Sequence, residues 1–569
     1  MLLWYLSCIL SCIDTRLFVY SSMSTLLCGN WVRMLMCAIF LIVCLMSRQI
    51  FKVTRIMIYI SLWIIYMIFH GLVFTFSEYY VLFNDISMLV FAVLLHAIIK
   101  SGIITYKDID KGVMLILFIH ISYLLLQYLG ILDSGSSYFK LTGCGDNPNV
   151  TAILLVTCTP FLTRMIYRRY HIYINSILLI LSIIFLFVLR CRTAYIGMFL
   201  IVFTAFVVKY HERIKAMRKP VVIIGVVVTC LLVGLLSNHL YKMKQSSADG
   251  RIFIWKQTVG MIADNPVGVG YGMFERSYNN YVSEYFATHE TERKHSILTS
   301  RVVSAYNDYL EQGAEGGIVG MLFLVGFYLL LVWETVRRRD IFSLSIVVAY
   351  MVMSAVNFII LTNIPWLLLL CVTSMIKSSD KEKLYFLSNQ KLTILPLLLI
   401  SLLVLFFDTR FIIAQSMLKQ YKCLYKRTNF VTKGRLDSLR NIIGTSEAYY
   451  TFCSEYSAAS GNYQKAIEYG LEALKYTSSP NLMLSVSEYY EKNKDLSNAV
   501  SMMKRLSDML PGNFSTKYLM LLLYEKAGNH SAARTMAVEI TEKPVKIESE
   551  ETSYIKAYAM RYLNQSLCE

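Results

Sequence analysis

The side chains best suited to chemistry lie at the end of one apolar segment and in one long polar segment. Arg192 follows Cys191 at the end of an apolar run, where a charge is costly unless it serves a partner or a pathway. The segment 239–315 contains imidazole and carboxylate groups, the usual general bases of enzymes. The candidates among them are His289, His295, Glu311 and Glu315. The alternatives are interfacial snorkelling for the arginine and plain solvation for the loop residues.

Two other kinds of site are not indicated. Gly268, Gly270 and Gly272 alternate after Pro266, but no Lys-Ser or Lys-Thr pair follows and no strand precedes. The glycines therefore predict a close turn and argue against a nucleotide-binding loop. The 13 cysteines form no CxxC pair and no metal-ligand spacing, and several lie in or beside apolar runs, where a small, soft side chain packs well. We expect neither a metal nor a cofactor.

An unusually apolar chain must position these groups. Of its 569 residues, 56% are hydrophobic and 16% are charged, whereas roughly a quarter are charged in a soluble domain. Apolar stretches of about the length that crosses a bilayer recur up to residue 407. They predict twelve spanning helices near 34–47, 56–76, 81–99, 112–131, 149–167, 172–189, 193–209, 220–238, 316–335, 341–359, 362–376 and 392–407. Residues 1–33 are a thirteenth helix, a signal-like segment or an upstream extension.

The loops between these helices differ in charge. One alternate set is rich in Lys and Arg, and the other contains Lys140, Arg190 and Arg192. Because basic loops stay in the cytoplasm, segment 239–315 and everything after residue 408 are predicted to lie outside it. The net charge of +17 is then mostly a topology signal, which argues against nucleic-acid binding.

Residues 408–569 have a mixed polar composition and contain a repeat. The similar segments are GNYQKAI from Gly461, KDLSNAV from Lys494 and GNHSAAR from Gly528. Their aligned alanines, Ala466, Ala499 and Ala533, are separated by 33 and 34 residues. This period resembles that of tetratricopeptide repeats, with an unrelated array of α-hairpins as the alternative. We expect a helical repeat domain that binds a peptide or protein partner on a concave face.

Five motifs occur in a fixed order along the chain. They are TGCGDNPNV from Thr142, CRTAYIGM from Cys191, DGRIFIWKQT from Asp249, NPVGVGYGMF from Asn265 and SAYNDYLEQGAEGGIVGM from Ser304. Together they resemble the O-antigen ligase and polymerase family of bacterial envelope glycosyltransferases. The resemblance implies an all-α, polytopic, GT-C-like enzyme of the bacterial inner membrane. Its transferase domain would be 34–407, with loop 239–315 and the repeat domain in the periplasm.

Such enzymes take a glycan from undecaprenyl pyrophosphate and pass it to a hydroxyl of lipid A core, of a growing polysaccharide or of a protein Ser or Thr. The resemblance implies that Arg192 and Arg251 hold the pyrophosphate, because guanidinium groups chelate phosphate oxygens in a planar fork. It also suggests a group of substrate-contacting residues. These are Asn147, Asn149, Arg301, Asn307 and Glu315.

The general base departs from the family pattern. Many relatives have a His directly before the Asn of the closing motif, whereas here Tyr306 precedes Asn307. Since the unperturbed pKa of tyrosine is about 10, Tyr306 is better suited to positioning the glycan. His295, His289, Glu311 or Glu315 would then take the acceptor proton. We expect a metal-independent reaction that inverts the sugar's anomeric configuration.

The sequence leaves other functions open. A membrane transporter or flippase with an external partner-binding domain is one alternative, although no duplicated halves are apparent. A scaffold for envelope assembly is another. Within the transferase interpretation the acceptor is undecided, and the repeat domain favours a protein acceptor or a protein partner.

Overall fold

The computed structural model describes most of the chain. The residues that it does not describe are 13–21, 48–52, 74–78, 135, 137, 146, 212, 214–244, 289–299, 361, 377–389, 429–432, 444–445, 546–547 and 566–569. The described part is helical, and it contains no strand. It divides into two compact units. Unit 1 comprises Met1–Val73, Tyr79–Met243 and Tyr306–Lys419, and unit 2 comprises Phe74–Glu78, Lys244–Ala305 and Gln420–Glu569.

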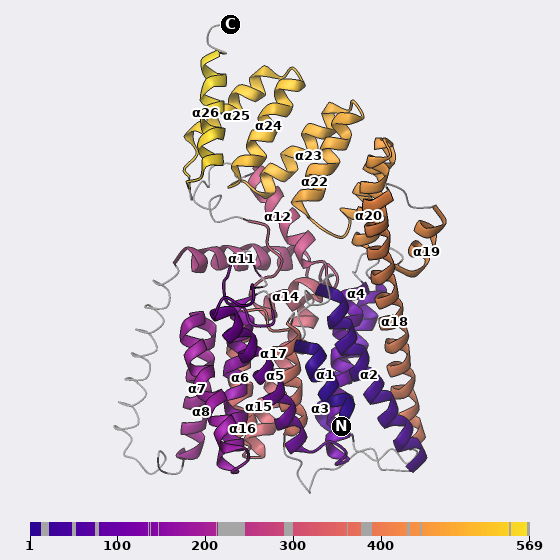
Figure 1. Ribbon diagram of the computed structural model, residues 1–569, viewed down its shortest axis with the longest axis vertical. Coiled ribbons are helices and arrows are strands. Elements are labelled where there is room, and N and C mark those ends of the chain that lie inside the picture. The colour runs from indigo at the N-terminus through magenta and orange to yellow at the C-terminus, as the bar shows by residue number, and fades with distance from the viewer. Residues whose placement is uncertain are drawn as a thin grey trace. The chain divides into compact units, whose positions relative to one another are not determined.

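Unit 1 is a bundle of apolar helices (Figure 1). Its helices are α1 (Leu2–Cys12), α2 (Ser22–Ser47), α3 (Arg55–Val73), α4 (Tyr79–Lys100), α5 (Tyr106–Tyr128), α6 (Pro148–Tyr167), α7 (Ile172–Leu189), α8 (Arg192–Lys209), α14 (Asp308–Glu315), α15 (Gly317–Arg337), α16 (Ile341–Ser354), α17 (Asn363–Met375) and most of α18 (Gln390–Thr428). Every predicted span coincides with one of these helices except 220–238, which lies outside the described residues. Eight helices in the described part are long and apolar enough to cross a membrane.

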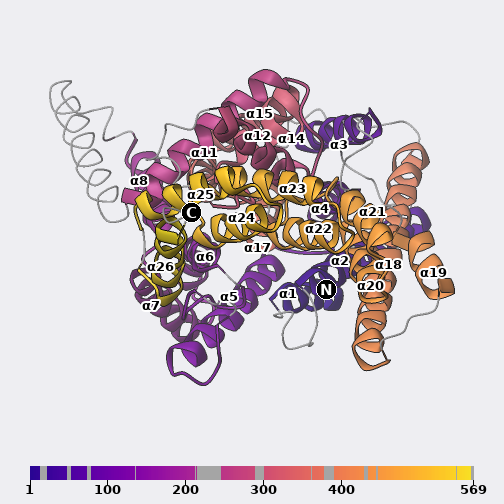
Figure 2. The same ribbon diagram turned by 90° about the horizontal axis from the view of Figure 1, so that it is seen from above.

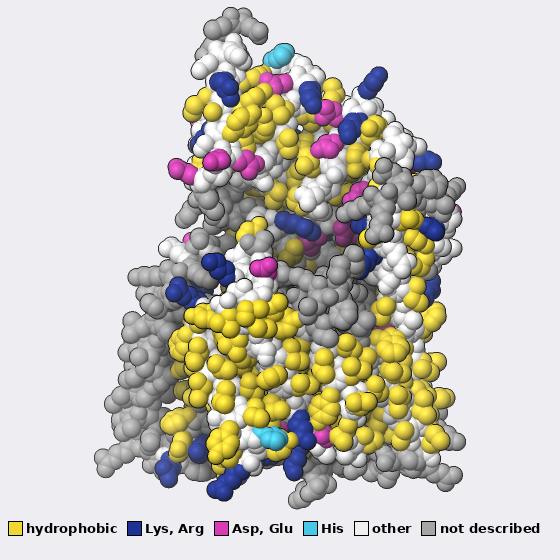
Figure 3. Space-filling model, in the orientation of Figure 1, with side chains coloured by type: hydrophobic (Ala, Val, Ile, Leu, Met, Phe, Trp, Pro, Cys, Tyr) yellow, Lys and Arg dark blue, Asp and Glu magenta, His cyan; other side chains and the backbone are white. Residues whose placement is uncertain are grey.

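The surface of unit 1 is as apolar as its sequence suggests. Figure 3 shows hydrophobic side chains covering the visible face of these helices, with Lys and Arg gathered at one end. Large apolar side chains are strongly exposed, such as Leu72 at 78%, Phe187 at 67% and Leu399 at 67%. Exposed apolar surface on this scale is unfavourable in water and suits the hydrocarbon of a bilayer. The predicted all-α, polytopic membrane fold is confirmed.

The C-terminal part of unit 2 is a series of short helices. They are α19 (Lys433–Ile443), α20 (Glu447–Ala459), α21 (Tyr463–Ala473), α22 (Pro480–Lys492), α23 (Leu496–Met509), α24 (Phe514–Lys526), α25 (His530–Glu542) and α26 (Glu550–Gln565). Each of these helices packs against the next one, and Figure 2 shows α21 to α25 side by side. We call α19 to α26 the C-terminal helices.

Equivalent positions of the predicted repeat have equivalent structures. Asn462, Asp495 and Asn529 begin α21, α23 and α25, and each side chain accepts a hydrogen bond from a backbone N–H three residues later. The aligned alanines Ala466, Ala499 and Ala533 are all fully buried. Helix pairs therefore recur at the predicted spacing, and their assignment to the tetratricopeptide class stays a prediction.

The predicted long loop is largely helical. It contains α11 (Gln245–Asp264) and α12 (Phe274–Thr288), and both belong to unit 2. Gly268, Gly270 and Gly272 between them have φ of 96°, 103° and 76°, which a residue with a Cβ adopts only under strain. The close turn predicted from these glycines is confirmed.

Candidate functional site

One end of unit 1 gathers most of the predicted site residues. α6, α8 and α15 begin at this end and α16 finishes there, because successive spans run in opposite directions. α16 packs against both α8 and α15. Asn147, Arg192 and Tyr306 each stand at or just before the start of one of these helices or of α14. We call this end of unit 1 the site end.

Arg192 is the first residue of α8. Its neighbour Cys191 is the N-cap and is 2% exposed, and Arg192 itself is partly buried. The N-terminus of a helix carries a partial positive charge that adds to the field of a guanidinium group. An anion is therefore favoured at this position by both the side chain and the backbone.

Asn147 caps α6. Its side-chain oxygen accepts from the backbone N–H of Asn149 at 2.9 Å. The preceding segment is fixed by Gln127 of α5, whose Oε1 accepts from the N–H groups of Thr142 and Gly143 at 3.0 and 2.9 Å. These contacts hold the segment before α6 in one conformation, so any glycan contact by the two asparagines would come from a rigid cap.

The third residue of the closing motif, Tyr306, is strained. Tyr306 has a φ of 52°, which is uncommon for a residue with a side chain and often marks a functional site. Its ring meets the edge of Phe358 at 5.3 Å between centroids. Asn307 then caps α14 by accepting from the N–H groups of Tyr309 and Leu310 at 3.0 and 3.1 Å. The motif is thus a sharp turn followed by a capped helix.

α14 is short and acidic, yet its acids are buried. Glu311 is 4% exposed and Glu315 is 3% exposed. The alternative in which these two residues are simply solvated is wrong, because water does not reach them. They are four residues apart and so share one face of the helix. Burying carboxylates is costly unless other groups compensate their charge, which makes this face a candidate for chemistry.

Asp308 is a residue that the sequence reasoning missed. It is 2% exposed, and its carboxylate accepts from the N–H of Ile359 at 2.9 Å and from that of Ile360 at 3.3 Å. These two residues lie between α16 and α17, so Asp308 ties the start of α14 to that turn. Its place directly after the capping asparagine was the available signal.

The other two arginines of the predicted site, Arg251 and Arg301, lie in unit 2. Arg251 is partly buried within α11. The same helix is held to the closing motif, because Trp255 Nε1 donates to the carbonyl of Ala305 at 3.0 Å. Arg301 forms an ion pair with Glu275 of α12 at 2.9 Å, so its guanidinium group has a partner within the protein.

The predicted histidine base is not described. His295, together with His289, lies outside the described residues. Among the residues that are described, no group of three or more His, Cys, Asp and Glu side chains could hold a metal ion.

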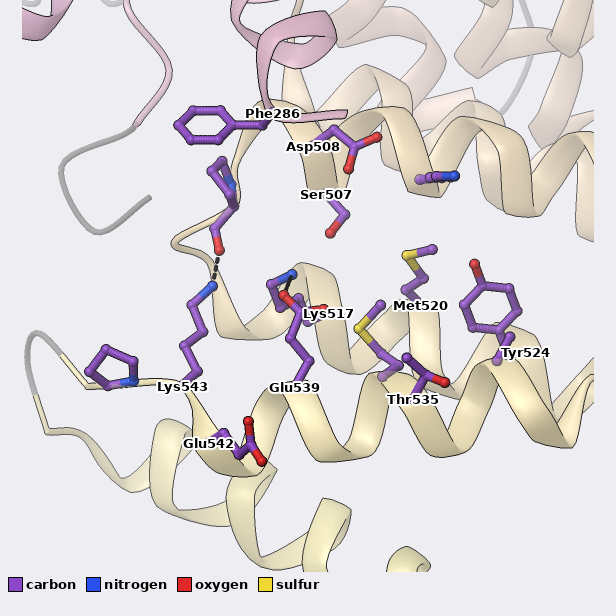
Figure 4. A pocket seen from close by; sticks show the side chains of 15 residues that line it. Phe286, Ser507, Asp508, Lys517, Met520, Tyr524, Thr535, Glu539, Glu542 and Lys543 are labelled. Carbon is purple, nitrogen blue, oxygen red and sulfur yellow. Dashed lines mark hydrogen bonds and ion pairs between the residues drawn. The ribbon is translucent and has the colours of Figure 1, made fainter. Parts of the chain in front are cut away.

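The C-terminal helices enclose a cavity of about 590 Å³. Figure 4 shows Lys517 beside Glu539 and Lys543 pointing into this space. Lys517 and Glu539 form an ion pair, and Lys543 donates to the backbone carbonyl of Pro511. Burial, followed by the neighbouring Lys517 ammonium, lowers the pKa of Lys543 to about 8. Phe286 of α12 also lines the cavity.

Comparison with known proteins finds a similarity in one part of the chain. No curated protein and no solved structure gives a significant match. Residues 177–325 match the family model described as O-antigen ligase. The match begins in α7 and ends in α15, and it includes Arg192, Arg251 and the closing motif. Residues 177–325 are therefore similar to the O-antigen ligase domain.

Proposed function

We propose that the protein transfers a glycan from undecaprenyl pyrophosphate to an acceptor hydroxyl at the periplasmic face of a bacterial inner membrane. The supporting observation is that a domain of the O-antigen ligase family places a helix N-terminal arginine, Arg192, and the buried acids of α14 at one end of a membrane bundle. This combination suits an anionic leaving group and a proton acceptor.

The chemistry needs one bond exchange. The acceptor oxygen attacks C1 of the sugar, and the bond between C1 and the pyrophosphate oxygen breaks. The electron pair leaves with undecaprenyl pyrophosphate, while the hydroxyl proton passes to a base on the protein. Arg192 and Arg251 would stabilise the departing pyrophosphate in place of a metal ion. Direct displacement inverts the configuration at C1.

A buried acid of α14 is the preferred base in this proposal. Glu311 or Glu315 would accept the proton, because both are buried in α14 and follow Tyr306 in the closing motif. Tyr306, with its strained backbone, would position the glycan. Linkage analysis of the product tests the stereochemistry, since retention of configuration would contradict direct attack.

The acceptor is proposed to be a protein or to be presented by one. The C-terminal helices favour this choice over lipid A core or a growing polysaccharide, because a helical array offers a surface for a polypeptide. The glycan phenotype of a deletion strain distinguishes the three: loss of protein glycosylation, of the lipopolysaccharide ladder or of a polysaccharide.

Alanine substitution tests the function. Arg192→Ala and Arg251→Ala should abolish glycan transfer in a complemented deletion strain while protein levels in the membrane stay unchanged. Lys256→Ala, an exposed residue on the same helix as Arg251, and Arg169→Ala, exposed at the opposite end of unit 1, are matched controls that should remain active. Normal transfer by both test variants would refute the proposal.

A further inference from the structure

The predicted loop and the C-terminal helices pack together within unit 2. α12 lies against α23. Ser283 Oγ donates to the carbonyl of Arg505 at 3.1 Å, and Arg505 Nη2 donates to Asn280 Oδ1 at 2.8 Å. Phe286, near the end of α12, packs on Phe253 of α11 with 6.0 Å between ring centroids and also lines the cavity of the C-terminal helices. α12 is therefore held from both sides.

Glu275, in the first turn of α12, is the centre of this contact. One carboxylate oxygen accepts from Ser478 Oγ at 2.6 Å, and the other accepts from Thr477 Oγ1 at 3.2 Å. These two hydroxyls lie between α21 and α22. The next residue, Arg276, donates from Nε to the carbonyl of Leu474 at 3.2 Å. The start of α12 is thus anchored to one turn of the C-terminal helices.

The same carboxylate also holds Arg301. Arg301 Nε lies 2.9 Å from Glu275 Oε1, and the Glu275 side chain is 18% exposed. The Arg301 side chain is 40% exposed, so water also competes for this ion pair. Glu275 therefore links the C-terminal helices to the segment that begins at Arg301.

A second acid, which belongs to the C-terminal helices, interacts electrostatically with this ion pair. The pKa of Glu447 in α20 is raised by burial and then by the nearby Glu275 carboxylate, while Arg301 and Lys422 act in the opposite direction. Arg301 thus pairs with Glu275, and its charge also lowers the pKa of Glu447 in the C-terminal helices.

Segment 301–305 has few degrees of freedom left. Asn279 of α12 donates from Nδ2 to the carbonyl of Val302 at 2.8 Å and accepts from its N–H at 3.1 Å. Trp255 of α11 holds the carbonyl of Ala305. The segment contains Ser304 and Ala305, the first two residues of the closing motif, and is joined directly to Tyr306.

We propose that Glu275 is a positioning residue through which the C-terminal helices hold the chain that enters the closing motif. This inference rests on the proposed function. It gives the C-terminal helices a second role besides binding a partner, which is to hold the start of the closing motif. Because a misplacement of about 1 Å can cost about 100-fold in rate, loosening this anchor should reduce transfer without removing a catalytic group.

The test compares three variants in the complemented deletion strain, with the strain's own lipid-linked glycan as donor. Glu275→Ala should lower the glycosylated fraction of the acceptor, per unit of folded protein in the membrane, by at least about tenfold. Glu275→Gln should recover a large part of this loss, because its amide oxygen still accepts from Ser478 and Arg301. Glu472→Gln, which affects an exposed ion pair with Lys475 on α21, is the matched control and should behave as wild type.

A measurement on purified full-length protein separates positioning from general destabilisation. Amide hydrogen exchange of residues 301–305 should accelerate in Glu275→Ala while exchange in α24 and α25 stays at the wild-type rate. The double variant Thr477→Ala/Ser478→Ala, which leaves Glu275 in place, should show the same localised acceleration to a smaller extent. Uniform acceleration throughout unit 2 would show a merely structural role and overturn the inference.

Different results would contradict this inference and the proposed function. If Arg192→Ala and Arg251→Ala are inactive but Glu275→Ala transfers normally, the transferase stands and the positioning role is wrong. If the two arginine variants transfer normally, the transferase proposal itself fails.

Discussion

At the scale of single residues, the closing motif combines strain with buried charge. Tyr306 adopts a left-handed backbone conformation, and the next turns of chain bury Asp308, Glu311 and Glu315. Neither arrangement is the most stable one for these residue types, and such departures concentrate at sites where function constrains the structure. Asp308 accepts hydrogen bonds from Ile359 and Ile360, and Glu311 and Glu315 are the acids of α14 that we propose as bases.

Neutralising the base should slow transfer sharply. We expect either Glu311→Gln or Glu315→Gln to reduce transfer by roughly 10²- to 10⁴-fold, the usual contribution of a general base, because an amide cannot take the acceptor proton. The other variant should be affected less. Acceptor glycosylation per membrane-inserted protein measures this. The exposed Glu284 of α12 supplies the control Glu284→Gln, and full activity in both test variants would exclude a carboxylate base on α14.

Lys543 predicts a pH dependence of stability in the C-terminal helices. Its pKa falls from 10.5 in the unfolded chain to about 8 in the folded one, so the unfolded state binds more protons between pH 8 and 10.5. The free energy of unfolding therefore rises with pH across this window, and the cost of the buried ammonium is fully present below pH 8.

Lys543→Met removes that ammonium. The stability of this variant relative to wild type, measured by hydrogen exchange in α25 and α26, should decline as the pH rises from 7.5 to 10. Lys526→Met, at a lysine that is 59% exposed, should show no such trend. A difference between Lys543→Met and wild type that is constant with pH would contradict the assigned pKa.

At the scale of elements, hydropathy predicted the spans well because a bilayer imposes length and composition on each helix separately. α7 matches its prediction at both ends (Ile172–Leu189). The repeat could also be predicted from the sequence, because the alanines that are buried and the residues that cap the helices recur along the chain. α11 and α12 were missed because they are less apolar and pack on surfaces that are distant in sequence.

The site was predicted only in part for the same reason. Arg192 was recognisable from its place at a helix end, and the burial of Glu311 and Glu315 depends on helices that surround α14 in space. Glu275 could not be found from spacing, because Ser478 is 203 residues away. Contacts of this kind become visible only once the fold brings the two segments together.

The repeat predicts a stabilising substitution. Gly461 and Gly528 end their helices with φ of 78° and 69°, whereas the equivalent position holds Lys494 with φ of 63°. A lysine in this conformation costs roughly 1 kcal/mol relative to glycine. Lys494→Gly should therefore slow local opening of α22 and α23, measured by amide hydrogen exchange. Gly461→Ala and Gly528→Ala should do the reverse in their own helix pairs, and faster exchange in Lys494→Gly would contradict the repeat equivalence.

At the scale of the whole molecule, the chain is an integral membrane protein whose polar part is assembled mainly from two separate stretches of sequence. The apolar exposed helices belong to unit 1. Unit 2 combines Lys244–Ala305 with Gln420–Glu569. The distribution of Lys and Arg supports the proposal that the basic loops are cytoplasmic and that both stretches of unit 2 lie outside the cytoplasm.

Cysteine labelling tests this orientation. Ser553→Cys on α26 should react with a membrane-impermeant maleimide in intact spheroplasts, and Lys107→Cys at the start of α5 should react only after permeabilisation. Both positions are exposed, so access is limited by the membrane alone. The parent chain measures background labelling of the native cysteines. The opposite pattern would reverse the topology.

The joining of α12 to a turn near Ser478 also governs when the protein can become active during its synthesis. The ribosome completes α12 long before it reaches Ser478, 203 residues after Glu275. At about 5–20 residues per second this interval is on the order of 10–40 s. During that time the loop lacks the turn that anchors it. If the anchor controls transfer, a nascent chain has its arginines and acids in place but begins to work only when its last quarter has emerged.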